Sequence, residues 1–324
     1  MNVAKTYQTS LFEDKPQHVS VREAIQNITW SHSRRSTLEQ CARRYYYHYF
    51  GANKRTAKRE LAKETLHFLK NRVQNRYMLA GSALHIVVKT YFDKAQLGDL
   101  WDVDRLIGFA RKIFRESWSY SQAHPDGKVT PNQKYPPILL QEYYYEHPEA
   151  EDLCAAEENR LVNALHSFAT NDLYDQFRVA GSAPAALVER KIKLGDFPCK
   201  VAGKIDLAYQ ANAGVSVVDW KLGLGDGTGD DSLQLGVYAV WATDHFKCAP
   251  DAIRVCKVHL SSNETADFRI NTQVLASVRA RIIQDAERMV ALEEYGKEAI
   301  VEAFTRCEKP SICNLCVFRR VCYD

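Results

Sequence analysis

The sequence contains no uninterrupted apolar run as long as the roughly 18 residues that mark a candidate membrane-spanning helix. Residues 1–17 also lack the apolar core of a secretory signal, so we expect no membrane partner, no export and a cytoplasmic location. No internal repeat, low-complexity tract or Walker phosphate-binding motif occurs, and we therefore expect no ATP-driven motor within this chain.

Any bias in total charge or composition is small. The 324 residues are 46% hydrophobic and 26% charged, with a net charge of only +3, which is ordinary for a globular protein. A chain of this length can bury a large core as one domain or as two closely packed ones. Its nine cysteines, an odd number without an export signal, favour metal ligands and free thiols over disulfides.

Basic residues are concentrated in the first third of the chain. Between residues 31 and 76 there are 12 lysines and arginines against three acidic residues, whereas residues 142–158 are acidic. A basic segment of this kind suits the phosphates of a nucleic acid, although a solvated helix face gives the same count. The charge pattern alone leaves both interpretations open.

The most informative stretch is 215–222, in which alternate residues point to opposite faces of a predicted strand. Asp219 and Lys221 fall on the same face, about 6.6 Å apart along the chain. A carboxylate is a hard ligand for Mg²⁺ and an amine can orient or deprotonate a nucleophile, so the pair can address one metal-bound water. Asp206 ends the preceding hydrophobic strand, and an antiparallel hairpin would bring it beside Asp219.

A Gly203-x-x-Asp206 strand joined by a short turn to an Asp219-x-Lys221 strand resembles the PD-(D/E)XK nuclease superfamily. The resemblance is to its RecB-like branch with an iron–sulfur cluster, which includes the nuclease domain of AddB and the CRISPR-associated adaptation nucleases. It extends through dispersed motifs over nearly the whole chain. It implies an α/β fold of the restriction-endonuclease-like type, with a mixed sheet flanked by helices, a large N-terminal helical region and a C-terminal cysteine module.

The order of segments follows from the resemblance together with the local patterns. We expect a flexible leader over residues 1–30, a helical region over 31–184, the nuclease core over 185–270, a helix over 271–304 and an iron–sulfur tail over 305–324.

Local patterns also predict the strands and helix starts of the core. Strands over 188–194, 201–207 and 215–222 should be antiparallel in this order, and a strand over 253–260 should run parallel to the third after a helical crossover. Near the N-terminus, we expect Ser33 to be the N-cap of a helix that continues through Cys41.

The resemblance also implies the ligands and the catalytic groups. His85, in a G-x-x-x-H context, would bind Mg²⁺ or Mn²⁺ together with Asp206, Asp219 and the carbonyl of Trp220. Lys221 would position or activate a water molecule. The pair Gln234-x-x-x-Tyr238 matches a Q-x-x-x-Y motif that lines the DNA path. Glu189 remains open between a role in the site and a simple ion pair with a nearby basic residue.

The last cysteines have the spacing Cys313-x2-Cys316-x5-Cys322, which favours a bound metal or cluster. Cys307 as the fourth ligand would make a local site that suits zinc as well as iron. Cys41 would instead match the family's arrangement of one N-terminal and three C-terminal cysteines on a 4Fe–4S cluster. We favour Cys41 because the residues around it also match, and we expect the cluster to staple the chain ends together without redox chemistry.

The expected activity is that of a Mg²⁺- or Mn²⁺-dependent DNA nuclease, more specifically an exonuclease on single-stranded DNA or DNA ends in repair, recombination or defence. We expect a helicase or a defence or repair protein as a partner. Non-specific phosphate contacts are expected from Arg34, Arg35, Arg43 and Arg44. The alternative is a DNA-end binding or scaffold subunit of a larger complex, with little activity of its own.

Overall fold

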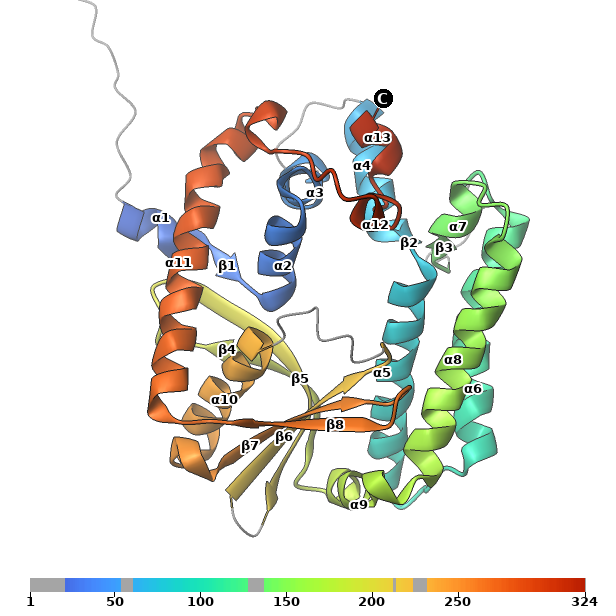
Figure 1. Cartoon of the computed structure of the whole chain (residues 1–324), viewed down its shortest axis with the longest axis vertical. Coiled ribbons are helices and arrows are strands. Elements are labelled where there is room, and N and C mark those ends of the chain that lie inside the picture. Colours follow the sequence, from blue (N-terminus) through green and yellow to red (C-terminus); the bar gives the residue numbers. More distant parts are fainter. Residues whose placement is uncertain (1–20, 54–60, 128–136, 212–213, 224–231, 324) are drawn as a thin grey trace, which may run out of the picture.

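A mixed β-sheet with helices on both of its faces forms the centre of the computed structural model (Figure 1). The structure describes residues 21–53, 61–127, 137–211, 214–223 and 232–323. The mixed α/β class predicted from the sequence is therefore confirmed. Among the described helices, none combines the length and the apolar character needed to cross a membrane.

The first three core strands are antiparallel in the predicted order. They are β4 (Leu187–Leu194), β5 (Lys200–Ala211) and β6 (Gly214–Lys221). Strand β7 (Ile253–His259) is parallel to β6, as predicted, because helix α10 (Ser232–Phe246) carries the chain back across the sheet between them.

Two further strands of this sheet were not foreseen. Strand β1 (Thr29–Trp30) pairs in parallel with the start of β5, and β8 (Glu264–Arg269) pairs antiparallel with β7. Helix α1 (Val21–Asn27) precedes β1, so the predicted leader is wrong for residues 21–30, which are folded. The rest of that prediction, residues 1–20, lies outside the described residues.

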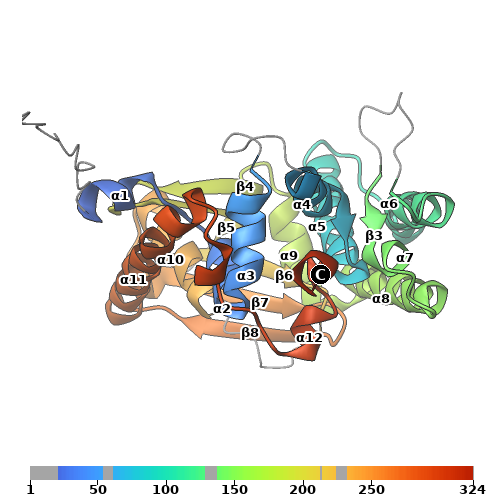
Figure 2. The same ribbon diagram turned by 90° about the horizontal axis from the view of Figure 1, so that it is seen from above.

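The alternation of β6 separates two hydrophobic cores. Val215 and Val217 belong to one core, with α10 and α11 (Thr272–Lys297), whereas Val218 and Trp220 belong to the other. On the side of the second core, the sheet packs against a bundle of three long helices, of which α5 (Arg76–Ala95) lies nearest to it (Figures 1 and 2). The other two are α6 (Val103–Ala123) and α8 (Ala150–Thr170). Because β6 has a core on each face, its residues from 215 to 220 are all buried, and the adjacent Val217 and Val218 are both apolar.

The remaining elements are shorter. They connect the sheet to the helices on its faces or lie near the ends of the chain. They are α2 (His32–Gln40), α3 (Ala42–Tyr46), the π-helix η1 (Tyr47–Gly51), α4 (Leu61–Arg72), β2 (Val73–Gln74), β3 (Leu139–Leu140), α7 (Gln141–Tyr144), η3 (Asp172–Tyr174), α9 (Asp175–Ser182), η4 (Pro250–Ala252), η5 (Val301–Ala303), α12 (Pro310–Cys313) and α13 (Arg319–Tyr323).

The first helix after β1 begins and ends differently from the prediction. Ser31, not Ser33, is the N-cap of α2, because its extended backbone lets its Oγ accept a hydrogen bond from the Arg34 amide at 3.2 Å. The helix also stops at Gln40. Cys41 has an extended backbone and caps the next helix, α3, so it lies at a junction and not within a continuous helix.

A break in the strand pairing creates the space for a site. Val201 of β5 pairs with both β4 and β1, whereas Leu207 pairs with both β4 and β6. Strands β1 and β6 therefore share one edge of β5 at opposite ends. Among the described strands, none pairs with residues 202–206 on that edge. Asp206 lies where β5 and β6 separate, and its carboxylate can reach between them.

Candidate active site

One cavity of about 710 Å³ is lined by polar side chains from the sheet and from the helices around it. Helix α5 forms one wall, the start of α2 forms another, and strands β4, β5 and β6 with helix α10 supply the floor. Every side chain predicted for catalysis or for the metal lines this cavity, and Glu189 joins them. These residues are His85, Glu189, Asp206, Asp219, Lys221, Gln234 and Tyr238.

A histidine and two carboxylates form the tightest group in the cavity. His85 Nδ1 lies 3.0 Å from Glu189 Oε1 and 3.4 Å from Asp206 Oδ1. The ligand atoms of the three residues all lie within 4.8 Å of one another. Imidazole nitrogen and carboxylate oxygens suit Mg²⁺ or Mn²⁺ with positions left for water, so this donor set fits the predicted metal.

Glu189 is held in an unusual backbone conformation. Its φ is 48°, in the left-handed region that residues with a Cβ rarely adopt, although its neighbours Val188 and Arg190 pair regularly with β5. Its carboxylate contacts His85 from this conformation. The sequence left the role of Glu189 open, and only its place in the resemblance pointed to the site.

Burial shapes the charge of Asp219. Its side chain is almost completely buried, which raises its pKa to about 6, even though Lys221 Nζ at 2.9 Å from Oδ2 opposes the rise. Strand β6 also fixes the Asp206 side chain of β5, because Asp206 Oδ2 accepts the Trp220 amide hydrogen at 2.8 Å. The indole of Trp220 is buried in the core on the opposite face, and its carbonyl as a metal ligand stays a prediction.

A chain of hydrogen bonds fixes the lysine amine. Lys221 Nζ donates to Gln234 Oε1 at 3.1 Å, and Gln234 Nε2 donates to Tyr238 Oη at 2.7 Å. The Tyr238 hydroxyl donates to the Lys204 carbonyl at 2.8 Å. Burial, with the nearby carboxylates Asp219 and Asp206, raises the pKa of Tyr238 well above its ordinary value, so the phenol is a neutral donor.

The two neighbouring carboxylates favour the protonated form of His85. Burial lowers the pKa of His85, but hydrogen bonds to the carboxylates of Asp206 and Glu189 outweigh that effect and raise it to about 10. A metal ion binds the neutral imidazole, so coordination by His85 must release this proton.

The four arginines predicted to contact DNA make contacts within the protein. Arg35 is 7% exposed, and its guanidinium pairs with Glu39 at 3.0 Å and with Asp285 at 3.3 Å. Arg35 is therefore not available to a phosphate, and that part of the prediction is wrong. Arg34 donates to the Tyr45 hydroxyl at 2.9 Å and lies over its ring.

Arg43 and Arg44 belong to the neighbourhood of the cysteines. Arg43 Nε donates to the Phe304 carbonyl at 2.8 Å, and Arg44 lines a pocket together with Cys41. Phosphate contacts from Arg34, Arg43 and Arg44 remain predictions. In the described part of the chain, the lysines that line the catalytic cavity are Lys89, Lys204 and Lys221.

Five cysteines from the two ends of the chain line one small pocket. They are Cys41, Cys307, Cys313, Cys316 and Cys322. The Cys41 Sγ accepts the Arg44 amide hydrogen at 3.3 Å, which places this sulfur at the N-terminus of α3. The structure therefore brings the N-terminal cysteine to the C-terminal three, with Cys307 beside them.

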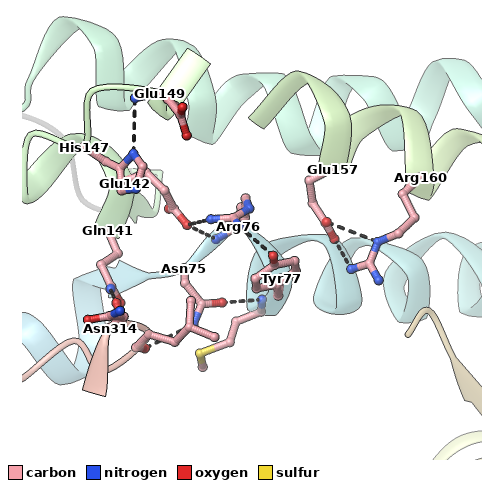
Figure 3. Close-up of polar contacts among 12 residues, drawn as sticks. Asn75, Arg76, Tyr77, Gln141, Glu142, His147, Glu149, Glu157, Arg160 and Asn314 are labelled. Atoms are coloured by element: carbon pink, nitrogen blue, oxygen red, sulfur yellow. Dashed lines mark hydrogen bonds and ion pairs between the residues drawn. The ribbon is translucent and has the colours of Figure 1, made fainter. Parts of the chain in front are cut away.

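Polar side chains hold this C-terminal tail against α7 and against the start of α5, the helix that carries His85. Gln141 Nε2 donates to the Asn314 carbonyl at 2.7 Å, and Asn75 Nδ2 donates to the Leu315 carbonyl at 3.3 Å (Figure 3). Asn75 is also the N-cap of α5, since its Oδ1 accepts the Met78 amide hydrogen at 2.9 Å. One side chain thus joins the tail to the start of the histidine-bearing helix.

Comparison with known proteins agrees with this geometry. No curated protein matches the chain significantly. The family model of the PD-(D/E)XK nuclease superfamily matches residues 29–323, from β1 to the end of α13. The matched segment includes every residue of the cavity and all five cysteines of the tail pocket. The chain belongs to the PD-(D/E)XK nuclease superfamily.

Proposed function

We propose that this protein is a Mg²⁺- or Mn²⁺-dependent deoxyribonuclease that acts on single-stranded DNA or DNA ends as an exonuclease. The observation that carries the proposal is the contact of His85, Glu189 and Asp206 within one cavity that also holds Asp219 and Lys221. Membership of a nuclease superfamily supports the reaction class.

The side chains of the site have separate roles in phosphodiester hydrolysis. His85, Glu189, Asp206 and Asp219 would hold the metal, which when bound polarises the scissile phosphate and lowers the pKa of a coordinated water. Lys221, held in place by Gln234, positions that water and offsets negative charge that develops on the phosphate. Tyr238 is the neutral hydroxyl that fixes Gln234.

An apolar wall beside the metal group favours unpaired bases. Met78 and Ile86, on the same side of α5 as His85, line the cavity and are 44% and 45% exposed. Exposed apolar side chains next to a polar centre suit the faces of unstacked bases, which a duplex keeps inside its helix. This arrangement supports a single strand as the substrate.

Cleavage of labelled DNA tests the substrate directly. We expect digestion of a linear single strand in Mn²⁺ from one end, slower digestion of blunt duplex, and none of a circular single strand. Ile86→Asp should weaken binding of single strands roughly tenfold, since it places a charge against the bases. Val179→Asp, on an exposed position of α9, is the matched control and should bind as the parent does.

Other patterns of cleavage would contradict the proposal. Cutting of circular single strands would exclude an obligatory exonuclease. If Ile86→Asp and Val179→Asp both digest duplex and single-stranded DNA at equal rates, the apolar wall has no role in substrate choice. DNA-end binding without cleavage in any divalent metal would favour the scaffold alternative.

We also propose that Cys41, Cys313, Cys316 and Cys322 hold a 4Fe–4S cluster that fastens the chain ends together. Their common pocket supports this assignment, and so do the cations around them. Arg43, Arg44 and Arg306 favour the thiolate forms of Cys316 and Cys322, against the burial that raises the pKa of both thiols. Positive side chains would equally balance the negative charge of an iron–sulfur centre.

A further inference from the structure

A second lysine contacts the metal-binding group, and its role differs from that of Lys221. The Lys204 ammonium forms an ion pair with Glu189 Oε2, while the other oxygen of Glu189 faces His85. The Lys204 side chain is 49% exposed and lines the catalytic cavity. One carboxylate of the site is thus shared between an imidazole and a half-exposed ammonium.

The two lysines are held to different degrees. Lys221 contacts both Asp219 and Gln234 and is mostly enclosed. For the Lys204 ammonium, Glu189 is the one ion-pair partner found among the described residues. Its backbone, by contrast, is fixed on both sides, because Tyr238 donates to its carbonyl and β4 pairs with it across the sheet. The side chain can therefore move while the strand stays in place.

A divalent ion and the ammonium cannot both sit close to Glu189 without strong repulsion. An ion held by His85, Glu189 and Asp206 would carry two positive charges within a few ångströms of Lys204. The exposed ammonium can move into the open cavity beside it, but only by giving up its ion pair with Glu189. The cavity is also where the phosphates of a substrate strand would enter, and a phosphate is the natural partner for a displaced ammonium.

We propose that Lys204 competes with the divalent metal ion for Glu189 and, once displaced, binds a substrate phosphate. Lys204 is thereby a positioning residue that couples metal binding to DNA binding. This inference rests on the proposed function, because it takes the group around His85 to be the metal site.

Metal affinity measured without DNA tests the first half of the inference. Lys204→Met removes the competing cation, so it should bind Mn²⁺ about tenfold more tightly than the parent by titration calorimetry or Mn²⁺ spin resonance. Lys204→Arg should restore the parental affinity. Lys89→Met is the matched control, because Lys89 lines the same cavity but pairs with Asp93, and its Mn²⁺ affinity should stay within about twofold of the parent. Equal or weaker Mn²⁺ binding by Lys204→Met would overturn the inference.

The salt dependence of DNA binding tests the second half. In Ca²⁺, which should occupy the site without supporting cleavage, the slope of log affinity against log salt should be smaller for Lys204→Met by about one phosphate contact. In EDTA the parent and the variant should have the same slope, because Lys204 then remains paired with Glu189. Equal slopes in Ca²⁺, or a difference that persists in EDTA, would contradict the coupling.

The outcomes separate this inference from the proposed function. If the parent protein binds no Mn²⁺, both the proposed function and the role of Lys204 are wrong. A parent that binds Mn²⁺ and cleaves DNA, beside a Lys204→Met variant with unchanged affinity and slopes, would remove the role of Lys204 alone.

Discussion

Replacing Asp219 by asparagine should reduce Mn²⁺-dependent DNA cleavage by at least roughly 1,000-fold, because it removes a buried negative charge that the metal and Lys221 both require. The asparagine is close in size, so the cavity keeps its shape. Initial rates on labelled single-stranded DNA, measured at saturating Mn²⁺, give the comparison with the parent.

The same variant should not lose stability. Because burial raises the pKa of Asp219 to about 6, its ionised form disfavours folding at neutral pH, and removal of the charge should leave the melting temperature unchanged or higher. Asp196→Asn is the matched control, since that carboxylate is 92% exposed in the β4–β5 turn. A cleavage rate for Asp219→Asn within tenfold of the parent would remove Asp219 from the catalytic group.

Replacing Cys41 by serine should abolish the proposed cluster and weaken the fold. Iron content should fall from about four atoms per chain to near zero, and the visible iron–sulfur absorption should be lost. The melting temperature should drop by roughly 10 °C or more, since a bound cluster contributes its binding free energy to folding. Anaerobically purified protein, analysed for iron, sulfide and zinc, provides the measurement.

Cys307→Ser provides the control within the same pocket. It should keep its iron, because Cys307 is the fifth cysteine and its replacement leaves four ligands. The reverse result, with iron lost from Cys307→Ser and kept by Cys41→Ser, would make the site a local C-terminal one. Stoichiometric zinc in the parent protein would show that the cysteines bind zinc and not an iron–sulfur cluster.

Features encoded by short-range patterns were predictable from the sequence. The period-two alternation around Asp219 and Lys221 identified β6 and its two faces, and the helical crossover after it predicted the parallel pairing of β7. The i, i+4 spacing of Gln234 and Tyr238 placed both residues on one face of α10, where they form a hydrogen bond. Each of these features depends on residues close together in the chain.

Features that depend on distant partners were not predictable. Strand β1 has only two residues, and its pairing with β5 depends on a segment 171 positions away, at Thr29 and Lys200. Arg35 looked like a phosphate contact because its buried partner Asp285 lies on α11, far along the sequence. The backbone conformation of Glu189 has no local signal, since glutamate rarely adopts a positive φ.

Anomalous diffraction from a crystal soaked in Mn²⁺ would locate the metal without any assay of activity. We expect a peak within coordination distance of His85, Glu189, Asp206 and Asp219, with the Lys221 amine close to a water on the ion. A peak at another place in the molecule, or none beside these four residues at saturating Mn²⁺, would contradict the proposed metal site.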